Sequence, residues 1–161
     1  MSVNIDTRVV GPGNDEYVED AWQLKERIRQ REGVLKQRKG FFSDAYRRSK
    51  VHLFVEDGPS TSIIGFCAVR RDGYILFLAV DPSHRGEDIG KKLVAMVAEE
   101  HRSVTCHART TNENALRFYE HLGFDIKRRI DNYYEDGGDA YYLKLGDDAS
   151  LTARLSEFMR R

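Results

Sequence analysis

Short apolar runs separated by turn residues dominate the middle of the chain. The runs Val51–Val55, Ile63–Val69 and Tyr74–Val80 are rich in β-branched and aromatic residues and have the length of strands. Gly-, Asp- and Pro-containing segments lie between them, so the pattern predicts three consecutive antiparallel strands. After the third run, Asp81-Pro82-Ser83 predicts a turn, and apolar residues then recur near helical spacing as far as about His101.

The same patterns predict elements on both sides of this middle part. Towards the N-terminus they predict a strand, a helix capped by a side chain, a turn or short helix, and another helix: Val3–Val10, Tyr17–Arg31 with Asn14 or Asp15 as cap, Val34–Lys39 and Phe41–Ser49. Towards the C-terminus they predict a strand, a helix, a hairpin and a terminal helix: Val104–Ala108, Asn114–Leu122, Phe124–Ile130 with Ala140–Leu145, and a helix marked by Leu151, Leu155 and Phe158. No repeat or long linker interrupts this order, which predicts one α+β domain on a mostly antiparallel sheet.

The turn that follows Val80 leads directly into a helix, and this arrangement favours an anion. Gly86 and Gly90 bracket the start of the helix, where unpaired backbone N–H groups and the positive end of the helix dipole converge on a phosphate. Arg85 adds a charge. The spacing excludes a Walker loop, because three residues separate the glycines and Lys92 stands where the loop needs Ser or Thr. The dinucleotide pattern GxGxxG is also absent.

The stretch Arg85-Gly86-Glu87-Asp88-Ile89-Gly90 resembles the Q/R-x-x-G-x-G/A pyrophosphate loop of the GNAT acetyltransferase superfamily. A second stretch, Asn112–Phe124, resembles that family's N-x-x-A-x-x-F/L-Y-x-x-x-G-F segment without a gap. The resemblance covers about residues 51–145. It implies the GNAT fold, a mixed, mostly antiparallel central sheet flanked by helices, in a single domain over 1–161. It also implies that acetyl-CoA (coenzyme A) is bound by Leu78, Ala79, Val80, Arg85, Gly86, Glu87, Asp88, Ile89, Gly90, Lys91 and Asn112.

One residue departs from the family's loop pattern. Asp88 stands where the family has its first motif glycine. Aspartate tolerates left-handed backbone better than most residues, so we expect the loop to keep its shape with the carboxylate turned to solvent. We also expect weaker cofactor binding than with glycine at this position, because a negative charge lies beside the pyrophosphate.

The resemblance further implies two catalytic residues. Tyr119 would protonate the departing CoA thiolate, a role that suits a phenol with a pKa of about 10. His107 lies five residues before the motif asparagine, where N-terminal acetyltransferases similar to this chain have Glu or His, and would be the base. Tyr74, on the adjoining predicted strand, is a second candidate group there. Ordinary core packing remains the alternative for each of the three side chains.

A third stretch concerns the substrate. Tyr133–Ala140 resembles the Y-Y-x-x-G-x-D-A segment of the branch that acetylates protein N-termini, including the ribosomal-protein alanine acetyltransferases. Tyr133 and Tyr134 would clamp a peptide backbone, and Glu135, Asp136 or Asp139 would attract the amine, unless Asp139 only fixes the turn. The alternative is an ordinary Gly/Asp hairpin turn flanked by strand aromatics. An α-amine of pKa about 8 is roughly one-tenth neutral at pH 7, which a neutral histidine can serve. The alternatives are acetylation of a small amine, an amino acid or lysine, and a non-catalytic acyl-CoA-binding regulatory module.

Charge and composition limit the classes of binding partner that we expect. The formal net charge is zero, but Lys25–Lys50 holds ten Lys/Arg against three acids. This segment is either a solvated helix face or a docking site for an acidic surface; its few aromatics look like core, so no direct nucleic-acid function is expected. The histidines and the two cysteines have no metal-ligand spacing. The absence of a signal-like or membrane-spanning run predicts a cytoplasmic protein with no membrane contact.

Overall fold

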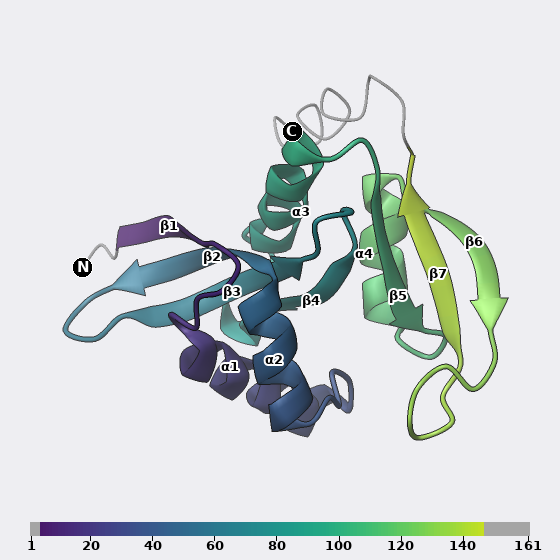
Figure 1. The fold of residues 1–161 in the computed structure, drawn as a ribbon, viewed down its shortest axis with the longest axis horizontal. Helices are drawn as coiled ribbons and strands as arrows, with labels where there is room; N and C mark the ends of the chain where they lie inside the picture. Colours follow the sequence, from purple (N-terminus) through teal and green to yellow (C-terminus); the bar gives the residue numbers. More distant parts are fainter. Residues whose placement is uncertain (1–3, 147–161) are drawn as a thin grey trace.

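The computed structural model describes residues 4–146, shown in Figure 1. In chain order the elements are β1 (Asn4–Val10), α1 (Val18–Glu32), α2 (Lys39–Arg48), β2 (Lys50–Asp57), β3 (Ser62–Val69), β4 (Ile75–Val80), a 3-10 turn (Pro82–His84), α3 (Ile89–Glu100), β5 (Val104–Arg109), α4 (Glu113–Leu122), β6 (Asp125–Ile130) and β7 (Ala140–Leu145). The predicted terminal helix at Leu151, Leu155 and Phe158 lies outside the described residues. The α+β class and the antiparallel pairing of the predicted hairpins are confirmed.

The strands form two antiparallel sheets that meet at one point. The first sheet has the order β1-β2-β3-β4 and the second the order β5-β7-β6. Between them, Tyr74 and Thr105 form an isolated parallel bridge, and the Thr105 N–H donates to the Gly73 carbonyl at 3.1 Å. The predicted central sheet is therefore divided, with β4 and β5 adjacent at this bridge (Figure 1).

Helices cover both faces of the first sheet. In β3, successive side chains point to opposite faces, so Phe66 and Ala68 pack towards α1 and α2, whereas Cys67 and Val69 pack towards α3. Both faces are thus removed from water, which explains why this strand is a continuous apolar run instead of an alternating one. Cys67 and Cys106 are buried free thiols, as core packing predicts.

Two local predictions near the N-terminus are wrong. Helix α1 begins after Tyr17, which has left-handed backbone (φ 68°) and makes no side-chain cap bond. Neither Asn14 nor Asp15 caps the helix, because the Asn14 side chain accepts the Glu16 N–H at 2.9 Å instead. The mistake arises because an Asx turn and an N-cap use the same residue types.

The second wrong prediction concerns the segment between α1 and α2. Residues 34–38 form a loop without helix, and α2 begins at Lys39. Leu35 has a φ of 56°, which interrupts any helical run. The buried Lys25 reaches across from α1 and donates from Nζ to the Gln37 carbonyl, so a side chain replaces the helical hydrogen bond.

Candidate active site

A cavity of about 640 Å³ opens between β4 and β5. Its walls come from β4, the loop before α3, β5, α4, the loop 34–37 and the loop between β6 and β7. Most of the sequence-predicted site residues line it: Leu78, Ala79, Val80, Arg85, Gly86, Asp88, Ile89, Gly90, Lys91, His107, Asn112, Tyr119 and Tyr134. Three others, Tyr74, Glu87 and Tyr133, are not in this lining. One cavity therefore collects side chains that are far apart in sequence.

The loop before α3 leaves the start of that helix uncapped. Gly86 and Asp88 both have left-handed backbone, with φ 89° and 62°. Asp88 is the N-cap residue of α3 but makes no side-chain cap bond, and the first turn contains no acidic residue. Its side chain is 55% exposed and lies 3.5 Å from Lys91 Nζ. The helix N-terminus thus keeps its backbone N–H groups free of a side-chain cap on a cavity wall, which fits an anionic group such as a pyrophosphate.

The two glycines of the loop serve different purposes. A Cβ at Gly86 would meet nothing within 4 Å, so this position needs glycine for its positive φ alone. A Cβ at Gly90 would lie 3.1 Å from the Phe118 ring, so this glycine allows α3 to approach α4 closely. The close approach brings the Asp88 end of α3 and the helix that carries Tyr119 to the same cavity.

Two charged residues of the loop are already paired with other parts of the chain. The Arg85 guanidinium lies 2.8 Å from the carboxylate of Glu32, the last residue of α1. Glu87 contacts His84 Nδ1 at 3.2 Å, and His84 Nε2 lies 3.5 Å from Glu56. The Arg85–Glu32 and His84–Glu56 contacts join residues that are distant in the chain, so sequence spacing did not predict them.

Tyr119 is a buried phenol at the cavity wall. It is 7% exposed and lies beside the buried Cys106 thiol. Burial, assisted by Cys106, raises the pKa of Tyr119 well above its ordinary value. The hydroxyl consequently stays protonated over the neutral range and keeps a proton to donate.

His107 lies within a cluster of aromatic hydroxyls. Its Nδ1 is 2.6 Å from the Tyr74 hydroxyl and 3.3 Å from the Tyr133 hydroxyl, and the Tyr133 ring stacks on the imidazole at 4.2 Å. Partial burial lowers the pKa of His107, and the charges of Arg128 and Arg70 lower it further. The imidazole is therefore neutral at pH 7 and can accept a proton.

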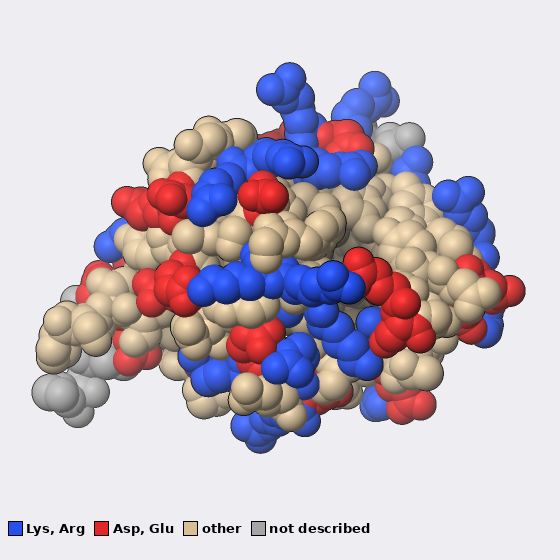
Figure 2. Space-filling view, turned by 60° about the horizontal axis from the view of Figure 1, so that its bottom comes forward, with Lys and Arg blue, Asp and Glu red and all other residues tan. Residues whose placement is uncertain are grey.

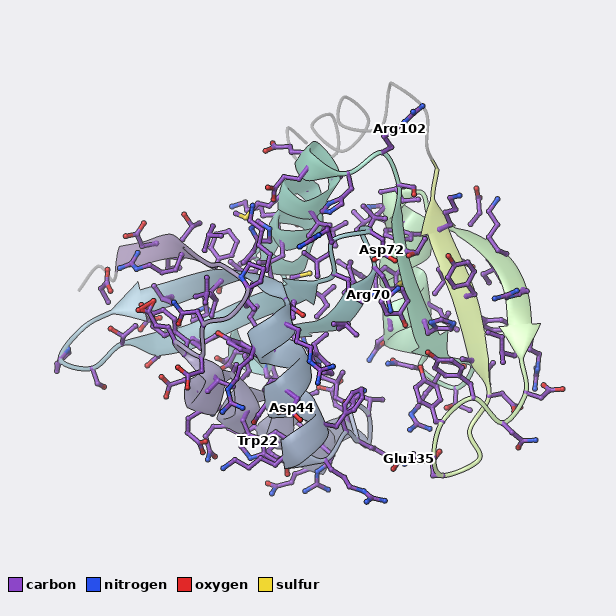
Figure 3. All side chains as sticks on the ribbon, in the orientation of Figure 1. Trp22, Asp44, Arg70, Asp72, Arg102 and Glu135 are labelled. Carbon is purple, nitrogen blue, oxygen red and sulfur yellow. The ribbon has the colours of Figure 1, made fainter. Side chains whose placement is uncertain are left out.

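Arg70 comes from the turn between β3 and β4 and is held in place there. Figure 3 labels Arg70 and Asp72 on this turn, where their side chains form an ion pair at 2.7 Å. The Arg70 guanidinium also lies 4.5 Å from the centre of the Tyr74 ring. The positive charge of Arg70 thus disfavours protonation of His107. Nothing in the sequence spacing indicated this arrangement.

The loop between β6 and β7 brings Tyr134 to the cavity. Arg109, at the end of β5, lies 4.0 Å from the centre of the Tyr134 ring and donates to Asp136 at 3.0 Å. Burial raises the pKa of Tyr134 to about 12. Asp139 accepts the Asn132 N–H at 2.9 Å and is paired with Arg129 at 2.7 Å, which supports a role in fixing the turn.

Asn112 has a structural role that needs no ligand. It is the N-cap of α4, and its side-chain oxygen accepts the Ala115 N–H at 3.2 Å. This contact explains the residue type at this position on its own. The carboxamide also lines the cavity, so a cap and a binding role are compatible.

The described part of the chain contains neither a metal-ligand cluster nor a membrane-spanning helix. Between residues 4 and 146 no group of three His, Cys, Asp or Glu side chains is arranged to hold a metal ion. None of the helices in the same range has the length and apolar character that crossing a bilayer requires.

Residues 48–126 match a family model described as an acetyltransferase (GNAT) domain. N-alpha-acetyltransferase 30 of Xenopus laevis is 44% identical over 80 residues, which make up 47% of this chain and 29% of that protein. N-alpha-acetyltransferase 30 of Saccharomyces cerevisiae is 38% identical over 82 residues, or 48% of this chain and 47% of that protein. The match therefore spans less than half the length of either relative.

Solved structures extend the likeness over most of the chain. Ard1 from Thermoplasma volcanium has a TM-score of 0.68 and 26% identity, covering 88% of this chain and 96% of that chain. A chain of the NatC complex bound to Gag peptide and CoA has a TM-score of 0.61 and 25% identity, covering 89% and 98%. The ribosomal-protein-S18-alanine N-acetyltransferase from Escherichia coli, with a TM-score of 0.69, 19% identity and coverage of 89% and 95%, shares the fold.

Proposed function

Because the chain carries an acetyltransferase domain of the GNAT family, we propose that it transfers the acetyl group of acetyl-CoA to the α-amino group of a protein or peptide N-terminus. The family assignment agrees with the GNAT fold expected from the sequence. The substrate and cofactor are inferred from the site and from relatives named N-alpha-acetyltransferases.

One observation carries the proposal. The cavity holds two titratable groups whose surroundings shift their pKa values in opposite directions. The pKa of His107 is lowered, which favours the neutral base, and the pKa of Tyr119 is raised, which favours the protonated acid. Such a pair at one cavity is typical of general acid–base catalysis. An attacking amine must lose a proton and a departing thiolate must gain one, so the pair fits acyl transfer from a thioester to an amine.

The cofactor would lie along the opening between β4 and β5. Leu78, Ala79 and Val80 belong to the last strand of the first sheet, whose backbone groups on the cavity side can bond an extended ligand. The uncapped start of α3, with Gly86 to Lys91, suits its pyrophosphate. Bound there, acetyl-CoA supplies the thioester that the amine attacks.

The side chains then perform two proton transfers. His107 takes the proton of the amine, either directly or through the Tyr74 hydroxyl that contacts its Nδ1. Tyr119 donates its hydroxyl proton to the sulfur as the thiolate leaves, and its burial beside Cys106 keeps that proton in place until then. No covalent intermediate on the protein is required.

An extended chain end fits the substrate side better than a small polyamine. The loop after α1 contributes Val34 and Leu35 to the cavity, and the opposite loop contributes Tyr134. Apolar walls on two sides suit the first side chain of a peptide, and the tyrosine hydroxyls of the loop suit its backbone. The α-amine is also the easier amine to deprotonate, since its pKa is about 8 against about 10.4 for lysine.

The proposal includes a cytoplasmic location and a docking role for Lys25–Lys50. The two buried free cysteines fit a reducing compartment. Figure 2 shows Lys and Arg side chains interspersed with Asp and Glu on one face of the molecule. Within the segment, Arg27 pairs with Asp81 and Arg38 with Glu135, so an acidic partner would have to replace such carboxylates.

The test is acetyl transfer from acetyl-CoA to peptides varied at their first residues. N-terminally blocked peptides that contain lysine, and free polyamines, are the matched controls. Transfer only to free peptide α-amines supports the proposal. Transfer to blocked peptides or polyamines contradicts the substrate, and CoA binding without transfer to any amine favours the regulatory alternative.

A further inference from the structure

Arg109 contacts the loop between β6 and β7 at three places. It lies two residues after His107 on β5, so both side chains point to the same side of the strand, and both line the cavity. Its side chain is only 14% exposed. The guanidinium lies 4.0 Å from the centre of the Tyr134 ring, and its Nη1 donates to Asp136 at 3.0 Å.

The third contact is with the loop backbone. A Cβ built at Gly138 would lie 2.4 Å from the Arg109 Nη1, so the guanidinium occupies the space that any other residue would need there. Asp136 also accepts the Gly138 N–H at 3.0 Å. Arg109 therefore packs against a turn whose shape depends on the same carboxylate that the guanidinium binds.

Asp136 connects this turn to the other side of the cavity. Its second oxygen accepts from Lys36 Nζ at 3.2 Å, and Lys36 belongs to the loop after α1. The Arg109 hydrogen bond is the main reason that the pKa of Asp136 is lowered, so the carboxylate stays charged and both contacts persist at neutral pH. Beside it, Glu135 pairs with Arg38 of the same facing segment, and Figure 3 labels Glu135 on the loop.

We propose that Arg109 is a positioning residue for the amine substrate: through Tyr134 and Asp136 it holds the loop between β6 and β7 against the loop after α1, and so fixes the two walls between which the chain end lies. This inference rests on the proposed peptide substrate. Arg109 acts through the loop and takes no part in the proton transfers. The binding of a small amine that reaches only His107 does not depend on Arg109.

The kinetic test is Arg109→Gln, which removes the charge and the planar stacking surface. Losing a charged hydrogen bond of this kind predicts a rise of roughly 10-fold or more in the peptide KM. The kcat should change by less than about 3-fold, because interactions lost equally from ground and transition states affect KM alone. Arg109→Lys should recover only part of the KM, since lysine keeps the charge for Asp136 but loses the flat contact with Tyr134.

A matched control removes an arginine of β6 that also pairs with a carboxylate next to this loop. Arg129 donates to Asp139 at 2.7 Å, but Asp139 keeps its bond from the Asn132 N–H when Arg129 is replaced. Arg129→Gln should therefore leave the peptide KM unchanged. If Arg109→Gln does not fold, Asp136→Asn carries the same test, because it removes the carboxylate that joins the two loops.

Hydrogen exchange of the free protein separates this inference from the proposed function. The Tyr134 and Gly137 N–H groups are hydrogen-bonded within the loop, at 3.0 and 2.9 Å, so their exchange reports its order. Faster exchange there in Arg109→Gln than in Arg129→Gln, together with the KM rise, supports the inference. Equal exchange or an unchanged KM overturns it, whereas a wild-type protein that acetylates no peptide defeats the proposed function whatever the exchange shows.

Discussion

Gly73 is the residue on which the junction of the two sheets depends most directly. It has a φ of 86°, and its carbonyl accepts the Thr105 N–H at the point where β4 and β5 meet. A Cβ built there would lie 2.4 Å from the Ser103 carbonyl oxygen and 3.3 Å from the His101 side chain. Backbone cannot yield as a flexible side chain can, so Gly73→Ala must displace one strand from the other.

The magnitude follows from two additive costs. A left-handed φ costs a non-glycine residue about 1 to 2 kcal/mol. Forcing an extra methyl group into a packed site typically costs about 1 to 3 kcal/mol more. Gly13 isolates the first cost, because its φ is 87° and a Cβ there would meet nothing within 4 Å. Gly73→Ala should thus lower the free energy of unfolding by about 2 kcal/mol more than Gly13→Ala.

The assay is equilibrium unfolding in urea, with both variants compared with the wild type. Gly73→Ala should also slow acetyl transfer, because Tyr74 is the next residue and its hydroxyl contacts His107. Gly13→Ala should leave transfer unchanged. Equal unfolding free energies for the two variants would refute the reasoning, since they would show that the close contact with Ser103 carries no energy.

Three further predictions concern the site itself. Tyr119→Phe should lower kcat by roughly 100-fold while changing the acetyl-CoA KM little, measured by steady-state kinetics. Because the pKa of His107 is lowered, wild-type kcat should stay constant until the pH falls below the ordinary histidine value of about 6.5. His107→Ala should remove this decrease of kcat at acidic pH. Asp88→Gly should tighten acetyl-CoA binding measured by calorimetry, since glycine adopts the φ of 62° freely and removes a charge near the pyrophosphate. An unchanged kcat in Tyr119→Phe or an unchanged pH dependence in His107→Ala would contradict the role given to that residue. An unchanged acetyl-CoA affinity in Asp88→Gly would likewise contradict the role given to Asp88.

The strands and motifs were accessible from sequence because their causes are local. Short apolar runs rich in β-branched and aromatic residues predicted β2 and β3 to within a few residues, and turn residues predicted their pairing. The left-handed backbone of Asp88 was likewise predicted, since it depends on the residue type and the loop pattern alone.

The loop at residues 34–38 and the division of the sheet have long-range causes. Residues 34–38 carry a helix-compatible pattern, but Lys25 reaches from α1 and bonds the Gln37 carbonyl. The division of the sheet likewise depends on which residues meet at the Tyr74–Thr105 bridge, and that meeting is set by packing across the domain. Arg109 had no sequence signal at all, because its partners Tyr134 and Asp136 are fixed only when the loop folds back.

The basic segment Lys25–Lys50 shows how charge along the chain differs from charge in space. Lys25 is buried, and Arg27, Lys36, Arg38 and Lys39 lie within 4 Å of carboxylates from other parts of the structure. The excess of positive charge in the sequence is thus partly neutralised where a partner would meet it. Exposed ion pairs of this kind contribute about 0 to 1 kcal/mol each, so an acidic partner can exchange for them at small cost. Docking through this segment should therefore be weak, because each contact replaces one that already exists.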